Sequence, residues 1–280
     1  MLGDDTVLVE CGPMRMFIDA SVNGRRVPQL ERQAAIKAIE FLSEVARDRD
    51  KLNIPAVLIK EEPSSAVVKE MWKACRVVNS SDLTPMAAVA GSIADATADY
   101  LTDLGATKII VNNGGDIALR ILEEAPVTVG IRSDLKSRLA QFKLTIERWD
   151  NLGGVCTSGL GGRSLTRGIA SAAVVFAKKS SVADAAATEI ANHTSIDSPK
   201  IKKTHARNLD PDSDIKDLEV TLNFDSLDGN EIEEAISKGL MRAKELVNSR
   251  AIVGAFVRVC DKFQAIGDLM TRLEPLNKSM

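Results

Sequence analysis

The segment SVADAAATEIANH, Ser181–His193, places a carboxylate and a hydroxyl one helical turn apart. Residues at positions i and i+4 lie one above the other on a helix, so Asp184 and Thr188 can direct oxygen atoms towards one point. Magnesium prefers such hard oxygen ligands and usually takes only one or two carboxylates besides phosphate oxygens. The alternative is structural: with Ser181 as N-cap, Asp184 occupies the position of a capping-box acid. Taken alone, the pair favours the cap.

A second polar segment is Asn113-Gly114-Gly115-Asp116, which lies between two β-rich runs. These residue types tolerate positive φ, so the segment is typical of a tight β-hairpin turn. In a functional interpretation, the bare backbone of Gly114 and Gly115 lets a ligand come close while Asp116 bonds a ribose or a base. For four residues alone, the hairpin is the commoner outcome.

The glycine-rich segment GGVCTSGLGGRS is the third candidate, and we expect it to form a loop. Thr157, Ser158 and Gly159 offer hydroxyl and N–H groups that suit phosphate or carbonyl oxygens, although a surface loop has the same composition. Cys156 precedes them and is the one weak catalytic candidate, since a small buried thiol is the commoner role for cysteine. The segment leads into a strand, which excludes a dinucleotide-binding fingerprint.

Composition limits the class of protein. The chain has 280 residues, 45% hydrophobic and 27% charged, with a net charge of -3, which is ordinary for a globular protein. Nothing in this balance favours a nucleic-acid or membrane partner, because either would need a basic face. The acidic start lacks a signal pattern, so we expect a cytoplasmic protein. Four scattered cysteines and two histidines disfavour disulfides and histidine-rich metal sites.

Hydrophobic periodicity predicts alternating helices and strands along the chain. We expect helices over 28–49, after Pro63 with a cap at Ser64 or Ser65, over 85–104 with Thr84 as cap, over 181–193, and one that Asn230 and Glu233 open together. We expect strands over 6–10, 15–22, 107–121 (as a hairpin), 125–133, 141–149, 168–177, 217–224 and 251–260. Residues 196–215 are polar and predict a long loop that is functional or mobile. No linker divides residues 1–280, which predicts a single domain.

The chain contains one weak internal echo. The segments IADATAD, Ile93–Asp99, and VADAAAT, Val182–Thr188, share an alternation of small and acidic residues. This pattern suggests that the domain consists of two similar, intertwined half-units.

The order of these motifs carries a resemblance. The helix PMAAVAGSIADA is followed by VNNGGDI, then CTSG, then ADAAAT. The same order is found in the ApbE-type FAD:protein FMN transferases, and the chain most resembles a sister family of those proteins. The resemblance covers about Pro85–Asn192, and the flanks match only the sister family. It implies an α+β fold of layered, mostly antiparallel sheets with helices, built from one domain or from two fused half-units.

The resemblance also implies a site. In that superfamily the Asp and Thr of the last motif bind magnesium with a backbone carbonyl from the alanine helix, which implies Asp184, Thr188 and Ala90 here. The metal holds the pyrophosphate of FAD. The nucleotide site is lined by the glycine and hydroxyl segments, which here are Gly114, Gly115, Asp116, Thr157, Ser158 and Gly159.

Two differences from the transferases affect the expected activity. Their H-x-x-D-P-x-T-G segment is replaced by GLGGRSLTRG, and the Lys after the helix Ala is Gly91. We therefore expect a cytoplasmic protein that binds FAD, FMN or a related nucleotide through Mg²⁺, without predicting the transfer reaction. The resemblance to the sister family implies one alternative, an accessory protein of sulfur assimilation towards homocysteine, acting through Cys156 or a sulfur-pathway partner protein. Another is a structural role as a homo-oligomer.

Overall fold

The structure, a computed structural model, describes residues 6–133 and 139–276, which divide into two compact units. Each unit is assembled from separate stretches of the sequence. The first contains the described residues up to Val127, Thr145–Cys156 and Phe176–Asp184, and the second contains those of Thr128–Leu144, Thr157–Val175 and the residues from Ala185 onwards.

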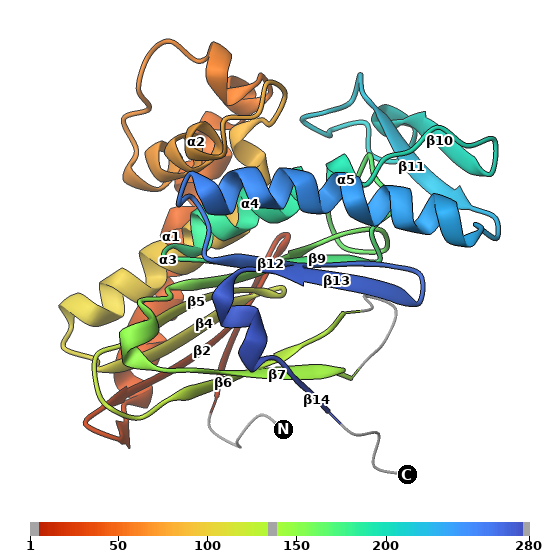
Figure 1. Cartoon of the computed structure of the whole chain (residues 1–280). Helices are drawn as coiled ribbons and strands as arrows, with labels where there is room; N and C mark the ends of the chain where they lie inside the picture. The colour runs from red at the N-terminus through yellow and green to blue at the C-terminus, as the bar shows by residue number, and fades with distance from the viewer. Residues whose placement is uncertain (1–5, 134–138, 277–280) are drawn as a thin grey trace. The chain divides into compact units, whose positions relative to one another are not determined.

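An antiparallel sheet forms the centre of the first unit (Figure 1). Its strands follow the order β1-β2-β4-β5, and Gly154 and Val155 of β8 pair with β5. Alternate residues of β2 are buried, which is the period of a strand with one face on a core. The bounds are β1 Val7–Cys11, β2 Met14–Val22, β3 Arg25–Arg26, β4 Lys108–Asn113, β5 Asp116–Ile121 and β8 Gly154–Ser158.

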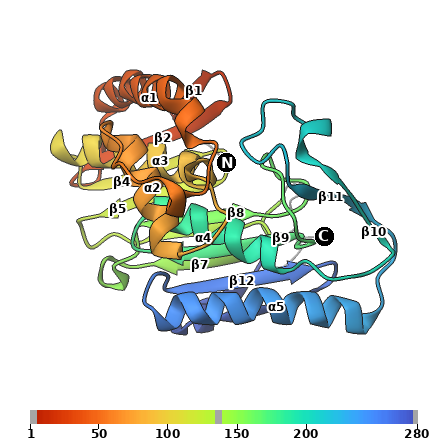
Figure 2. The ribbon, with the colours of Figure 1, turned by 90° about the horizontal axis from the view of Figure 1, so that it is seen from above.

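Three helices pack in this unit (Figure 2). Helix α1, Pro28–Asp48, packs on β1 and β2, and α3, Val89–Asp103, packs on β4 and β5. Helix α2, Ala66–Val78, packs against both. The alanine-rich sequence of α3 leaves little side-chain bulk, so a neighbouring backbone can come close.

At two of the expected N-caps, the side chain makes no capping hydrogen bond. Ser65 is the N-cap residue of α2, but its hydroxyl donates to Glu44 Oε2 at 2.6 Å and makes no cap bond. Thr84 precedes a 3-10 helix, Pro85–Ala88, without a side-chain cap, and the α-helix begins only at Val89. The first turn of α3 therefore needs hydrogen-bond acceptors from elsewhere.

The expected hairpin is confirmed. Strands β4 and β5 pair in register with Asn113 opposite Asp116, and Gly114 and Gly115 form the turn with φ of 72° and 119°. The Asn112 side chain supports it, since its Oδ1 accepts a hydrogen bond from Gly115 N at 2.9 Å.

The second unit is built around strands β12 and β13, which pair antiparallel beneath α5. Strand β9 neighbours β12, strands β10 and β11 form a separate pair, and β14, β7 and β6 form a small sheet. The bounds are β6 Val127–Ile131, β7 Phe142–Ile146, β9 Ala172–Ala177, β10 Ile201–His205, β11 Glu219–Phe224, α5 Gly229–Asn248, β12 Gly254–Val259, β13 Lys262–Ile266 and β14 Glu274–Pro275.

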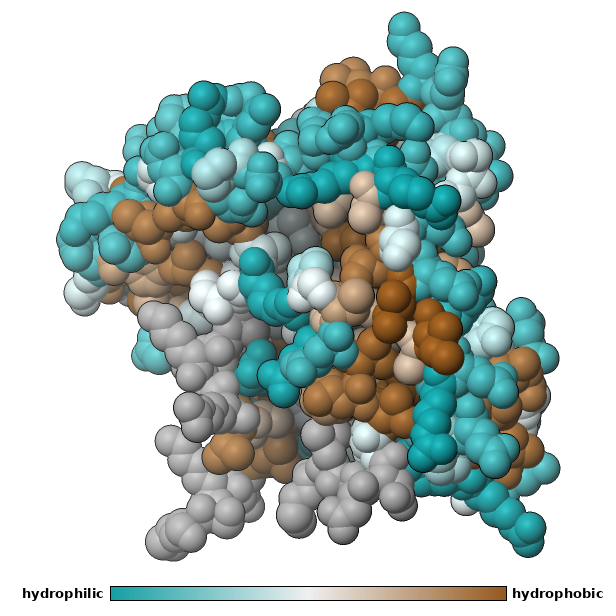
Figure 3. Space-filling model, turned by 180° about the vertical axis from the view of Figure 1, so that it is seen from behind, coloured by the Kyte–Doolittle hydropathy of each residue, from teal (hydrophilic) through white to brown (hydrophobic). Residues whose placement is uncertain are grey.

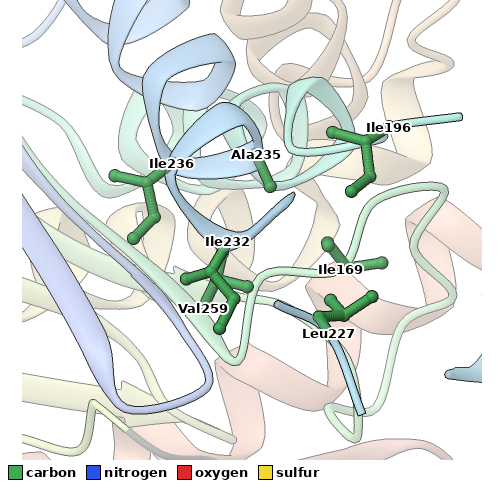
Figure 4. Packing of buried hydrophobic residues seen from close by; sticks show 7 residues of the cluster. All are labelled: Ile169, Ile196, Leu227, Ile232, Ala235, Ile236 and Val259. Atoms are coloured by element: carbon green, nitrogen blue, oxygen red, sulfur yellow. The ribbon is translucent and has the colours of Figure 1, made fainter. Parts of the chain in front are cut away.

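A cluster of aliphatic side chains forms part of the core of this unit (Figure 4). Ile232, Ala235 and Ile236 lie at helical spacing on α5 and face Val259 of β12. Further members come from loops, so the cluster comprises Ile169, Ile196, Leu227, Ile232, Ala235, Ile236 and Val259. Burying such side chains contributes roughly 1.5–3 kcal/mol each.

The start of α5 differs from the expectation by a residue or two. Asp228 is the N-cap, and its Oδ1 accepts hydrogen bonds from the backbone N–H groups of Asn230 and Glu231. Glu231 Oε2 in turn accepts from Asp228 N at 2.8 Å, which completes a capping box. The helix opening predicted at Asn230 and Glu233 is therefore two residues too late, since Asp228 and Glu231 hold those positions.

Two predicted loops are partly strands. In the glycine-rich segment, Gly154–Ser158 is β8, because Gly154 and Val155 pair with the neighbouring strand β5. Within residues 196–215, β10 pairs with β11, although its Lys202 and Lys203 are exposed and conceal any apolar alternation. Both strands are stabilised by backbone pairing with distant residues, which local composition does not reveal.

The fold class is confirmed as α+β with mostly antiparallel sheets. In the part of the chain that the structure describes, none of the helices is both long and apolar enough to span a bilayer. Figure 3 shows hydrophobic residues exposed among hydrophilic ones on one face.

Candidate functional site

The first turns of α3 and of α4, Ser180–His193, meet within the first unit. Asp184 Oδ2 accepts a hydrogen bond from Gly91 N at 2.8 Å, and Ala90 N also bonds to this carboxylate. These N–H groups belong to the first turn of α3, where the helix itself offers no acceptor. Asp184 therefore caps α3. The capping box expected from Ser181 is wrong, because α4 begins at Ser180 and Ser181 already lies inside the helix.

The contact is reciprocal. Asp95, on α3, accepts a hydrogen bond through Oδ2 from Ser181 N at 2.8 Å, and Ser180 N also bonds to it. Both N–H groups lie in the first turn of α4. Each helix thus supplies the carboxylate that caps the other, and the two aspartates occupy matching positions in the sequence echo.

Two glycines make this approach possible. A Cβ atom on Gly91 would overlap the backbone carbonyl of Ser180 and stand 2.8 Å from the Cβ of Asp184. A Cβ atom on Gly154 of β8 would overlap the Ser180 backbone and stand 2.6 Å from the Lys179 carbonyl carbon. Gly91 therefore lets the start of α4 approach α3.

Arg120 on β5 accompanies Asp95. Its Nη2 lies 3.0 Å from Asp95 Oδ1 and 2.7 Å from Asp99 Oδ1, one turn further along α3. The Asp95 side chain is 5% exposed, whereas that of Asp99 is 60% exposed. Burial raises the pKa of Asp95, while the guanidinium and the Ser181 N–H oppose that shift.

Asp184 lies near other carboxylates instead. Burial first, and then the negative charge of Asp116, raise the pKa of Asp184 well above its ordinary range, and the N–H groups of α3 only partly oppose this. The charge of Asp95 adds to the repulsion. A divalent cation would relieve the repulsion between Asp184 and Asp116.

The candidate metal ligands near Asp184 are oxygen atoms, but they do not form a cluster of several metal-binding side chains. Among the described residues there is no group of three or more His, Cys, Asp or Glu side chains placed to hold a metal ion. A metal beside Asp184 would therefore need hydroxyl, backbone, water or phosphate oxygens to complete its coordination. This requirement fits magnesium, which usually takes one or two carboxylates.

The Ala90 carbonyl is engaged already. Asn113 Nδ2 donates a hydrogen bond to Ala90 O at 3.2 Å, and the helix ladder of α3 uses the other lone pair of this oxygen. Ala90 O can bind a metal only if the Asn113 side chain turns away.

Cys156 is fully buried. Its Sγ donates to Ser180 O at 3.3 Å and lies 3.3 Å from Ser180 Oγ. Burial, and then the charges of Asp116 and Asp184, raise the pKa of the thiol well above its ordinary value. A protonated thiol is a poor nucleophile, so these surroundings favour a packing role that fixes the start of α4.

The predicted site residues are divided between the units. Gly114 is exposed in the hairpin turn, Gly115 and Asp116 are half-buried, and all three belong to the first unit. Thr188, also half-buried, lies one turn after Asp184 on α4 and belongs to the second unit.

The other predicted hydroxyl segment also belongs to the second unit. Thr157 is half-buried, while Ser158 is 5% exposed and Gly159 packs against Ala170. The loop expected to expose the N–H groups of these residues is therefore largely buried at Ser158 and Gly159.

Sequence reasoning missed Asp95, Arg120, Asn113 and Ser180. The echo between IADATAD and VADAAAT was the one signal that pairs Asp95 with Asp184. Nothing in the local pattern of β5 indicates that Arg120 joins them.

Comparisons with known proteins agree with this architecture. A family model described as "AbpE bacteria" matches residues 1–268. A UPF0280 protein of Methanococcoides burtonii is 45% identical over 119 residues, which is 42% of this chain and 49% of the relative. A UPF0280 protein of Methanobrevibacter smithii is 32% identical over 176 residues, which is 62% of this chain and 71% of the relative. The chain spans about half the length of the first of these relatives.

A solved structure shows the same fold. The flavin transferase ApbE from Vibrio cholerae superposes with a TM-score of 0.50 at 12% identity, covering 95% of this chain and 97% of the other. At this identity the similarity concerns the fold alone. The match over nearly the whole sequence assigns the chain to the family described as AbpE bacteria.

Proposed function

We propose that this protein binds a flavin nucleotide, FAD or FMN, through a magnesium ion held at Asp184. The proposal is supported by the family, by the fold shared with a flavin transferase, and above all by one observation. Asp184 is held at the start of α3 by Gly91 N at 2.8 Å, and burial first, then the charge of Asp116, raise the pKa of its carboxyl group, which a divalent cation would oppose.

The residues fit such an ion. Asp184 brings a carboxylate with several lone pairs besides the one that Gly91 N uses, and Asp116 brings a further carboxylate. Thr188 adds a hydroxyl one turn along the same helix, which is the spacing that directs side chains to one side. When bound, magnesium would supply positive charge for the diphosphate oxygens of the nucleotide. Ala90 O would join only after Asn113 turns away.

The remaining nucleotide contacts are assigned by motif. The exposed backbone at Gly114 and the adjacent Gly115 leave room for a ligand beside Asp116. Thr157, Ser158 and Gly159 belong to the second unit and stay a prediction from the motif, with Thr157 the most accessible of them.

Binding is proposed without transfer. The segment GLGGRSLTRG lacks the histidine and the Asp-Pro pair that the transferases carry, so no group is assigned to the transfer step. The sulfur-carrier alternative needs an accessible thiolate at Cys156, and the burial and raised pKa of this thiol weigh against it.

The test is calorimetric titration of FAD in Mg²⁺ and in EDTA. We expect the wild-type protein to bind FAD in Mg²⁺ and at least about tenfold more weakly in EDTA, a difference of about 1.4 kcal/mol. Asp184→Asn should bind weakly in both buffers, because it keeps an acceptor for Gly91 N but loses the charge.

Asp103→Asn is the matched control, because Asp103 is an exposed carboxylate on α3. This variant should behave as the wild type does. FAD affinity that is unchanged by EDTA, or unchanged in Asp184→Asn, would refute the proposal.

A further inference from the structure

We propose that Asp95 is a positioning residue for Asp184, and that the two carboxylates lock the starts of α3 and α4 through reciprocal caps. As a statement about metal binding this rests on the proposed function. The coupling between the two caps is a property of the first unit and can be tested without metal.

The side chain of Asp95 is held from two directions. Arg120 Nη2 contacts Oδ1 at 3.0 Å, and Ser181 N donates to Oδ2 at 2.8 Å. A carboxylate fixed at both oxygens has little rotamer freedom. It therefore sets the position of Ser181, three residues before Asp184 and on the same helical turn.

The close approach of the helices transmits that position. Ser180 is fully buried, and neither Gly91 nor Gly154 leaves room for even a methyl group beside its backbone. A shift in the first turn of α4 must therefore change the 2.8 Å contact between Asp184 Oδ2 and Gly91 N. Loss of the cap at Ser181 should then weaken the cap at Gly91, although Asp95 bonds only to the former.

The echo motif gives independent support for a role in cation binding. On α3, Asp95 and Asp99 lie one turn apart, and both contact a cationic group, the guanidinium of Arg120. On α4, the matching positions hold Asp184 and Thr188, also one turn apart. The pair on α3 thus binds an internal cation, Arg120, and the matching pair on α4 is proposed to bind an external cation, Mg²⁺.

Three variants test the positioning role. Asp95→Ala removes the cap of α4, whereas Asp95→Asn keeps an acceptor for Ser181 N and removes the charge. Asp99→Asn removes the other carboxylate that contacts Arg120. The Asp99 side chain is exposed and takes no part in either cap. All three should be compared under conditions where circular dichroism shows a folded protein.

The first measurement is amide hydrogen exchange in EDTA. In Asp95→Ala, exchange should quicken by about tenfold or more at Gly91 as well as at Ser181, corresponding to about 1.4 kcal/mol of lost protection. Asp95→Asn and Asp99→Asn should stay within about threefold of the wild type at Gly91. Faster exchange at Ser181 with Gly91 unchanged would overturn the coupling.

The second measurement is Mg²⁺ affinity by calorimetry. Asp95→Ala should bind Mg²⁺ at least about tenfold more weakly than the wild type, and Asp95→Asn should restore most of that loss. Unchanged affinity in folded Asp95→Ala would overturn the positioning role. If the wild type itself does not bind Mg²⁺, the proposed function fails, and the exchange at Gly91 still decides whether the caps are coupled.

Discussion

In the proposed function, Asp184 meets two demands with one carboxylate. Its Oδ2 caps α3 through Gly91 N, and the carboxylate is also proposed to bind the metal. The two demands are compatible because a carboxylate has two oxygens with several lone pairs. Spacing predicted the pair of Asp184 and Thr188 and a cap within α4, but not the cap on α3, because Asp184 and Gly91 are 93 residues apart in the sequence.

Replacing Asp184 should separate these two demands. Asp184→Ala removes the acceptor for the first turn of α3 and should lower the free energy of unfolding by about 0.5–2 kcal/mol in EDTA. Asp184→Asn keeps an acceptor and removes the repulsion from Asp116, so its stability in EDTA should equal or exceed that of the wild type. Urea unfolding measures both values, and an Asn variant as unstable as the Ala variant would contradict the cap.

Cys156 should be unreactive in the folded protein. Its thiol is fully buried with a raised pKa, whereas Cys11 is only half-buried. Alkylation with iodoacetamide, followed by peptide mass spectrometry, should modify Cys11 long before Cys156, with the unfolded protein as the control. Native labelling of Cys156 as fast as that of Cys11 would revive the sulfur-carrier alternative.

At the scale of elements, the contact between α3 and α4 depends on missing side chains. The backbone of Ser180 fits between Gly91 and Gly154, and a Cβ atom at either glycine would overlap it. The sequence showed that α3 is poor in bulk, which predicted a close neighbour. It did not identify that neighbour as α4, because contacts between distant segments leave no local pattern.

Gly91→Ala should therefore destabilise the protein. The added methyl group would overlap the Ser180 carbonyl, and overpacking of this kind costs about 1–3 kcal/mol. Gly229→Ala is the control, because that site meets only the end of the Lys262 side chain at 3.5 Å and should gain about 0.4–1 kcal/mol. Thermal or urea unfolding measures the change in the free energy of unfolding of both variants. A Gly91→Ala variant at least as stable as the wild type would contradict the close approach.

The start of α5 predicts a pH dependence. The pKa of Glu231 is lowered to about 2 by its hydrogen bond with Lys200, and then by those with Asp228 N and Ser198. A carboxyl group whose pKa is lower in the folded state stabilises it above the unfolded value of 4.5. That stabilisation is lost as the pH falls through the folded value of about 2.

Glu231→Gln should remove this part of the acid dependence. The urea midpoint of the variant should vary less with pH over the acidic range than that of the wild type. Glu234→Gln, which removes an exposed ion pair with Lys238, should keep the wild-type slope. Equal slopes in the wild type and Glu231→Gln would contradict the assignment.

At the scale of the molecule, local patterns predicted most elements and few of their partnerships. Periodicity located α1, and turn residues located the hairpin of β4 and β5, because both form between neighbours in the sequence. The local patterns missed β10, whose partner β11 begins fourteen residues further on, and they predicted a loop where β8 lies. The site shares this limit: the motifs gave Asp116 and Asp184, while Asp95 and Arg120 became visible only in the folded chain.

Asp184 is proposed to be the main ligand of a divalent cation. Mn²⁺ accepts the same oxygen ligands as Mg²⁺ and can be counted directly by electron paramagnetic resonance. With FAD present, we predict one tightly bound Mn²⁺ per chain in the wild type and in Asp99→Asn, and its loss in Asp184→Asn. If the Asp184→Asn variant binds Mn²⁺ as tightly as the wild type, this role of Asp184 is contradicted.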